Sequence, residues 1–199
     1  MCTTIVHTVF AVVLVLGFAA TLVALFTPGW RTVYWEGANK TAVEAVKDND
    51  YTLGILTSFC GGEATTANFE KTCKENFENK PLWEKMVIGA MILAVVTQVV
   101  AMVWSCVVCY ACCCKGCLAP PLPILTGLSA VFILIAVILF AVKNDSLDQL
   151  TKPPQEYKDL TGKNKIGYSI WLAIIAMLFM VADTVIGIIL CKTAEVSPV

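Results

Sequence analysis

The chain has 199 residues, of which 58% are hydrophobic and 15% charged, and its mean hydropathy is +0.76. Soluble domains carry about 25% charged residues, so this composition predicts a membrane protein. A net charge of −1 argues against a nucleic-acid partner. The sequence also shows no Ser/His/Asp set and no glycine-rich phosphate loop. We therefore expect neither an enzyme nor a bound cofactor.

Four long apolar stretches are predicted to cross the membrane, at residues 9–27, 86–110, 122–142 and 166–190. A span needs roughly 17–25 residues, and it must be helical because lipid cannot satisfy backbone polar groups. No Lys or Arg precedes the first stretch, which favours a retained helix over a cleaved signal peptide. Trp30, Trp83 and Trp171 are expected at one membrane interface.

Small residues recur on one face of several spans, which favours close helix packing in lipid. The predicted faces are Gly17, Ala20 and Ala24; Ala90, Ala94, Gln98, Ala101 and Ser105; and Ala176, Asp183 and Gly187. We therefore predict an all-α membrane protein over 1–199, a single domain built as a left-handed bundle of four helices. Its loops are residues 28–85 and 143–165.

Two polar residues lie inside the predicted spans, Gln98 and Asp183. A charged carboxylate at the bilayer centre costs roughly 2.5–3.5 kcal/mol, and Asp183 shares a face with Gly187, so it should point into the bundle. Gln98 is its expected partner. We favour a protonated or hydrogen-bonded contact between helices, and an ion path or a contact with a partner helix stays open.

The large first loop has strand-like patterns from Arg31 to Trp35 and from Tyr51 to Cys60. Two isolated cysteines, Cys60 and Cys73, suit a disulfide in an oxidising compartment. We expect a small extracellular sheet from this loop, joined by the second loop.

The orientation is predicted with both termini in the cytoplasm. Counting Lys and Arg alone would place the large loop inside. Two glycosylation acceptors, Asn39 and Asn144, lie on the side of the large loop, however, and they outweigh that count.

Six cysteines crowd between Cys106 and Cys117 at the cytoplasmic end of the second span. Reversible S-acylation with a fatty acid fits this position, while passive small hydrophobes and a metal site are the alternatives. The acylation candidates are Cys109, Cys112, Cys113, Cys114, Cys117 and Cys191.

A tryptophan after the first span, a Gly-Ile-Leu element and two cysteines in a large first loop resemble the signature of the claudin and peripheral myelin protein superfamily. The similarity is strongest to an invertebrate claudin-like protein. It covers the whole topology, and the residues that carry it are Trp30, Gly54, Leu56, Cys60 and Cys73.

The resemblance implies a plasma-membrane protein at cell–cell junctions. Its loops would contact like proteins beside it and across the cell gap, forming or regulating a paracellular barrier or adhesion contact. The alternatives are an auxiliary, gamma-like subunit of an ion channel and an adhesion protein without a barrier. Membrane lipid is the other partner, and Ser197 and Val199 fit a C-terminus that PDZ scaffolds bind.

Overall fold

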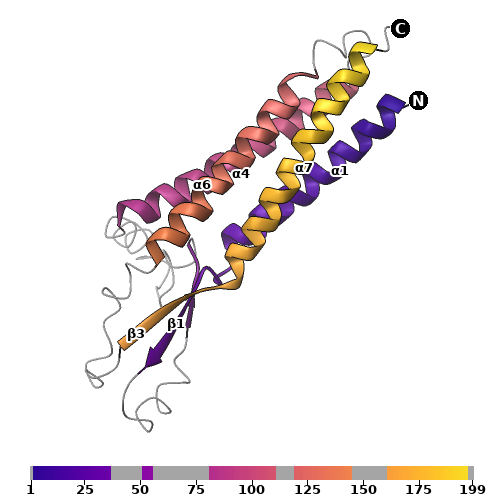
Figure 1. Ribbon diagram of the computed structural model, residues 1–199. Helices are drawn as coiled ribbons and strands as arrows, with labels where there is room; N and C mark the ends of the chain where they lie inside the picture. Colours follow the sequence, from indigo (N-terminus) through magenta and orange to yellow (C-terminus); the bar gives the residue numbers. More distant parts are fainter. Residues whose placement is uncertain (1, 37–50, 56–80, 111–118, 145–160, 197–199) are drawn as a thin grey trace, which may run out of the picture. The chain divides into compact units, whose positions relative to one another are not determined.

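The structure is a computed structural model that describes residues 2–36, 51–55, 81–110, 119–144 and 161–196 (Figure 1). Within these ranges the strands are described by their backbone alone, Ile166 excepted. The elements, in chain order, are α1 Cys2–Phe26, β1 Arg31–Glu36, β2 Tyr51–Leu53, α4 Leu82–Tyr110, α6 Pro121–Asn144, β3 Thr161–Ile166 and α7 Tyr168–Val196.

All four helices contain a stretch long and apolar enough to cross a membrane, which confirms the predicted spans. These stretches are Thr4–Phe26, Leu82–Tyr110, Pro121–Lys143 and Tyr168–Thr193. The helices extend beyond the predicted limits, since α1 begins at Cys2 and α7 ends at Val196. Hydropathy detects only the apolar part of a helix, whereas backbone hydrogen bonds continue into its polar ends.

The chain divides into two compact units. The first, here called the helix unit, comprises residues 1–23, 89–136 and 172–199, and the second, the loop unit, comprises 24–88 and 137–171. Each of the four helices contributes to both units, and the single domain over 1–199 stays a prediction.

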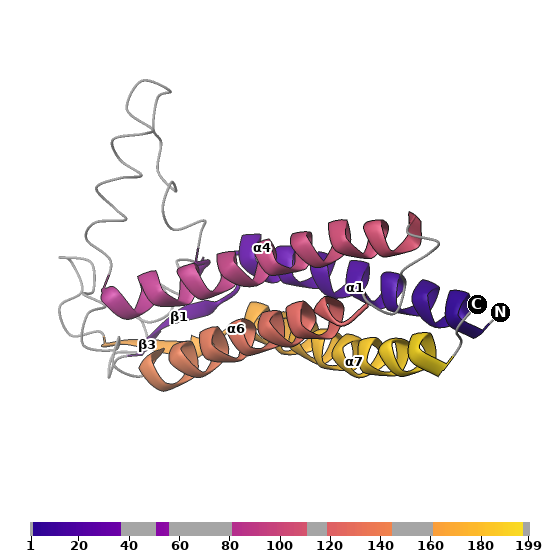
Figure 2. The same ribbon diagram turned by 90° about the horizontal axis from the view of Figure 1, so that it is seen from above.

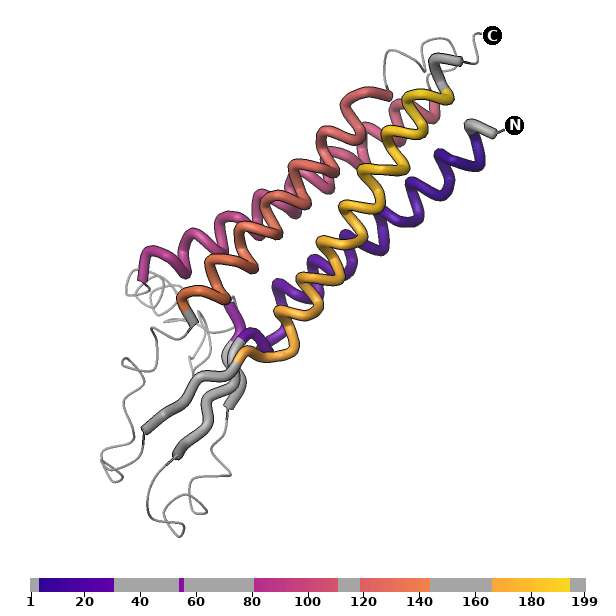
Figure 3. The backbone as a smooth tube through the Cα atoms, viewed as in Figure 1, coloured from indigo at the N-terminus to yellow at the C-terminus, as the bar shows by residue number. Residues whose placement is uncertain are grey.

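Small residues bring the helices together in the helix unit, where the four segments run side by side (Figures 1 and 2). A side chain at Gly17 would meet Met180 of α7, and one at Gly187 would meet Pro123 of α6 and Phe10 of α1. In this unit α1 begins at the same end at which α7 finishes (Figure 3). The bundle's handedness stays a prediction.

The predicted small-residue face of α4 is buried throughout. It comprises Ala90, Ala94, Gln98, Ala101 and Ser105, which are 0–8% exposed. The opposite residues, such as Val96 and Val103, are exposed hydrophobics, as a lipid-facing surface requires.

The loop unit contains an antiparallel sheet with the strand order β2-β1-β3. The central strand β1 pairs with β3 from Arg31↔Ile166 to Glu36↔Thr161, and with β2 from Arg31↔Leu53 to Val33↔Tyr51. This confirms a small sheet formed by both loops.

The position of β3 was not predicted, and the fourth span was expected to begin at residue 166. The sequence of β3, Thr-Gly-Lys-Asn-Lys-Ile, is poor in residues that favour strands. Its strand conformation comes from the pairing with β1, which ends at Ile166, so α7 begins at Tyr168.

Candidate functional site

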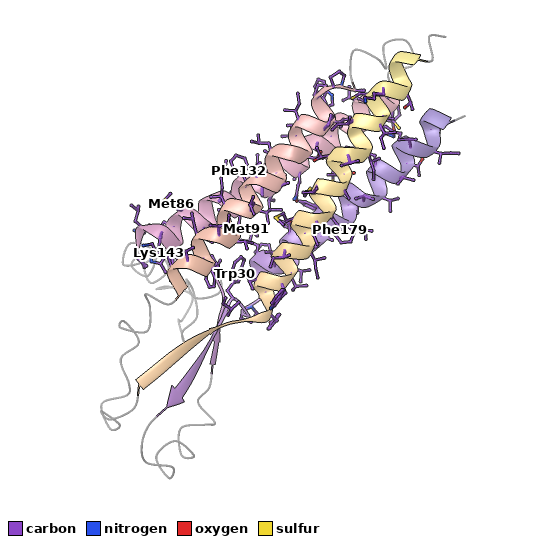
Figure 4. The ribbon with its side chains drawn as sticks, in the orientation of Figure 1. Trp30, Met86, Met91, Phe132, Lys143 and Phe179 are labelled. Atoms are coloured by element: carbon purple, nitrogen blue, oxygen red, sulfur yellow. The ribbon has the colours of Figure 1, made fainter. Side chains whose placement is uncertain are left out.

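Trp30 is fully buried in the loop unit, just before β1. Its indole Nε1–H donates a hydrogen bond to the Ala24 carbonyl at 2.6 Å, and its ring meets Phe140 edge-on at a centroid distance of 5.1 Å. A buried indole needs such an acceptor for its N–H. Figure 4 shows the side chain close to the start of β1.

Trp30 is therefore a core residue of the loop unit, and its position at the level of a membrane interface stays a prediction. Trp83 lies beside the same phenylalanine, with 6.2 Å between the ring centroids. Trp171 is 64% exposed and has the exposure of an interfacial anchor.

Backbone and side-chain hydrogen bonds tie the start of β1 to the start of α7. Ser169 N–H donates to the Gly29 carbonyl at 2.8 Å, Gly29 N–H donates to Ser169 Oγ at 3.1 Å, and Gly167 N–H donates to the Trp30 carbonyl at 3.0 Å. Thr27 Oγ1 lies 2.6 Å from Ser169 Oγ. We call these five residues, Thr27, Gly29, Trp30, Gly167 and Ser169, the loop joint.

One residue of the loop joint, Gly167, must be glycine because neighbouring backbone leaves no space for a side chain. A Cβ at Gly167 would collide with the Gly29 carbonyl group, and a Cβ at Gly29 would collide with the Tyr168 ring. The backbone angles themselves are ordinary, since no glycine in the described part of the chain has a positive φ. Gly167 therefore allows two backbone segments to touch, whereas the neighbour of Gly29 is the ring of Tyr168, an exposed side chain.

The loop joint is a common attachment point for two strands. It attaches β1, from the first loop, and β3, from the second loop, to helix ends that lie in the same unit. Sequence reasoning singled out Trp30 but missed Thr27, Gly29, Gly167 and Ser169. These residues were missed because the sequence did not reveal strand β3. The pairing of β3 with β1 places Gly167 and Ser169 beside Gly29.

Of the other residues in the family pattern, Gly54 is buried and directly follows β2. Leu56, Cys60 and Cys73 lie outside the described residues, and so do Asn39, Ser197 and Val199. Asn144 is the last residue of α6, and only its backbone is described.

Gln98 is the centre of a polar cluster in the helix unit. Its Nε2 group donates to Thr21 Oγ1 of α1 at 3.0 Å and to Ser129 Oγ of α6 at 2.9 Å. The side chain is 0% exposed, and its Oε1 atom accepts no hydrogen bond. Gln98 thus links three helices through its amide donors.

Asp183 is also 0% exposed, and neither carboxylate oxygen has a hydrogen-bond partner. It points into the bundle as predicted, but the expected hydrogen bond from Gln98 is not formed. The reason is that the two side chains lie at different positions along the axis of α6. The residue after Asp183, Thr184, meets Thr126 of α6 at 3.1 Å, whereas Gln98 meets Ser129, nearly one turn farther along α6.

The cysteines that the structure describes near the helix ends differ in their surroundings. Cys106 and Cys109 of α4 are exposed, and Cys191 of α7 is half-buried. Cys109 Sγ lies 3.5 Å from Nδ1 of His7, and the other ring nitrogen, Nε2, lies 3.3 Å from Ser105 Oγ. Sequence reasoning placed no histidine near this cluster, because His7 comes from α1.

The other acylation candidates, Cys112, Cys113, Cys114 and Cys117, lie outside the described residues. Within the described part of the chain, no group of three His, Cys, Asp or Glu side chains is arranged to hold a metal ion.

A comparison with protein families matches residues 1–196 to the family described as tight junction protein, claudin-like. A search of curated proteins found no match. The family match includes all four spans, both loops and every residue of the loop joint. The protein therefore belongs to the claudin-like tight junction family.

Proposed function

We propose that this multi-pass protein acts at cell–cell junctions of the plasma membrane. Its two loops contact like proteins beside it and across the cell gap, and they form or regulate a paracellular barrier or adhesion contact. The observation that carries this proposal is the loop joint, which makes one sheet from both loops and attaches it to the helix ends. The function is one of binding, without a catalytic step.

A sheet held in this way is a suitable contact surface. Ordering flexible loops on binding costs free energy, and a surface that is ordered beforehand avoids that cost. Among the described strands, β2 and β3 are the outer ones, each with a neighbour on one side only. The outer edge of a sheet offers backbone donors and acceptors to which a further strand can pair.

In the proposed orientation both loops lie outside the cell and both termini in the cytoplasm. The acceptors Asn39 and Asn144 support it, because glycosylation requires exposure to the secretory lumen. A disulfide between Cys60 and Cys73 suits the same compartment. The C-terminal Ser197 and Val199 would then be available to a cytoplasmic PDZ scaffold.

The test is expression in non-adherent cells mixed with cells that lack the protein. Enrichment at contacts between two expressing cells, but not at contacts with non-expressing cells, supports pairing across the gap. A rise in transepithelial resistance in an epithelial monolayer supports the barrier.

Two results would redirect the proposal. Contact enrichment without a change in resistance would leave adhesion alone. An altered current of a coexpressed channel, without enrichment at contacts, would support the auxiliary channel subunit instead.

A further inference from the structure

We propose that His7 is the base that makes Cys109 an acceptor of a fatty acyl group from a long-chain acyl thioester. This inference concerns the end of α4 in the helix unit and goes beyond the proposed contact function of the loops. It rests on a specific pair of side chains, one thiol and one imidazole, that come from two different helices.

The imidazole of His7 is held between a hydroxyl and a thiol. Its Nε2 atom lies 3.3 Å from Ser105 Oγ, and its Nδ1 atom lies 3.5 Å from Cys109 Sγ. Ser105 is 5% exposed, so its hydroxyl is a fixed partner inside the unit. When Ser105 Oγ accepts the Nε2 proton, Nδ1 carries the lone pair and faces the thiol. This is the arrangement of a nucleophile, a base and a residue that orients the base.

The position of Cys109 suits a membrane-bound acyl donor. It is exposed and is the penultimate residue of α4, at the end of the membrane-spanning stretch Leu82–Tyr110. Cys106, three residues earlier, is also an exposed free cysteine, but its thiol forms no hydrogen bond within the described part of the chain. Cys106 therefore serves as an internal control for Cys109. Both thiols are exposed on the same helix, but the thiol of Cys109 faces the base.

The proposed step exchanges one thioester for another. The thiol proton of Cys109 moves to Nδ1 of His7, and the thiolate attacks the carbonyl carbon of the acyl thioester. A carbon–sulfur bond forms to Cys109 and the bond to the leaving thiol breaks. The leaving thiolate takes the proton back from the imidazolium, and nothing is oxidised or reduced.

Other titratable groups on the surrounding helices bear on the pH dependence of this step. On α4 they are Cys106, Cys109 and Tyr110, on α7 they are Asp183, Cys191 and Lys192, and the described side chains of α6 in this unit include none. His7 is the sole titratable group among the described α1 side chains. A reference imidazole loses its proton near ~6.5 and a reference thiol near ~8.5, so the two routes to a thiolate differ in pH dependence.

The test uses the purified full chain in phosphatidylcholine vesicles with alkyne-tagged palmitoyl-CoA, followed by mass spectrometry of the labelled cysteines. We expect Cys109 to be labelled well before Cys106. His7→Asn should slow labelling of Cys109 by about 100-fold. In this variant the labelling rate should increase only at the higher pH at which a reference thiol loses its proton. Cys106→Ser should leave the labelling of Cys109 unchanged.

A thermal unfolding curve for His7→Asn shows whether the variant keeps the fold, and Ser105→Ala provides a second variant that keeps the base. Ser105→Ala should slow labelling less than His7→Asn does, because it loosens the ring without removing Nδ1. Labelling of intact cells separates the two sources of thioester. If labelling of Cys109 depends on His7 in vesicles, the acyl donor is free acyl-CoA. If it depends on His7 in cells alone, the donor is an acyl-enzyme.

Three results would overturn the proposal. The first is equal labelling of Cys106 and Cys109, and the second is a labelling rate of Cys109 that His7→Asn leaves unchanged both in vesicles and in intact cells. The third is stoichiometric zinc that is lost with either His7 or Cys109, since the 3.5 Å separation of nitrogen and sulfur also suits two ligands of one metal ion. None of these results bears on the contact assay for the loops.

Discussion

Gly29 and Ser169, 140 residues apart in the chain, exchange two hydrogen bonds. Ser169 N–H donates to the Gly29 carbonyl at 2.8 Å, and Gly29 N–H donates to Ser169 Oγ at 3.1 Å. One serine thus serves as both donor and acceptor for the segment between α1 and β1. Through this contact the two loops share one attachment.

Ser169→Ala should destabilise the protein by about 1–3 kcal/mol, because it leaves the buried Gly29 N–H without its acceptor. Chemical unfolding in detergent micelles measures the loss. Thr8→Ala is the control, since its hydroxyl donates to the Thr4 carbonyl at an exposed site and its removal should change stability by less than about 0.5 kcal/mol. Equal effects of the two changes would contradict a special role of Ser169.

Gly167→Ala should cost about 3 kcal/mol or more, because the added Cβ meets the Gly29 backbone, which cannot move aside as a side chain could. Reduced delivery to the cell surface and a lower melting temperature are the expected readouts. Gly89→Ala is the matched control: nothing lies within 4 Å of its Cβ position. In a helix interior that change should stabilise by up to about 1 kcal/mol.

Trp30→Phe removes the N–H that Ala24 accepts while keeping an aromatic ring beside Phe140. We expect a loss of about 1–3 kcal/mol, since a buried carbonyl loses its donor and the smaller ring leaves space. Trp171→Phe, at a side chain that is 64% exposed, should be nearly neutral. A neutral Trp30→Phe would show that the hydrogen bond does not support the fold.

Asp183→Leu should stabilise the helix unit by about 3 kcal/mol, because a buried carboxylate without a hydrogen-bond partner is replaced by an apolar group of similar branching. Gln98→Met should have the opposite sign, since its amide donates to Thr21 and Ser129. Unfolding in micelles gives both signs. If Asp183→Leu folds and reaches the surface but abolishes the contact or barrier activity, the carboxylate has a functional role.

Asn39→Gln and Asn144→Gln should each remove one glycosidase-sensitive step in gel mobility, as expected if both loops enter the secretory lumen. Asn164→Gln is the control, because Asn164 is followed by Lys165 and Ile166 and is no acceptor. A protein without any glycosidase-sensitive step would argue for loops on the cytoplasmic side.

Much of the fold follows from local patterns in the sequence. The four spans can be recognised because each must be apolar over its whole length in lipid, and the small-residue face of α4 follows from helical periodicity. The alternating residues of β1 also predict a strand. These features need no knowledge of what a residue touches.

The features that depend on contacts between distant segments could not be predicted in this way. The strand β3 has no strand signal of its own and forms because β1 offers its edge. Gln98 and Asp183 looked like partners, yet the alignment of α4 and α7 against α6 places them at different levels.

Composition and periodicity by themselves determined that this is a four-span membrane protein, because the cost of polar groups in lipid acts on each residue separately. The tertiary structure alone decided that Ser169 completes the loop joint and that His7 faces Cys109. Ser169 lies 140 residues from Gly29 in the chain, and His7 lies 102 residues from Cys109. Such contacts depend on how whole helices align, which no local sequence pattern records.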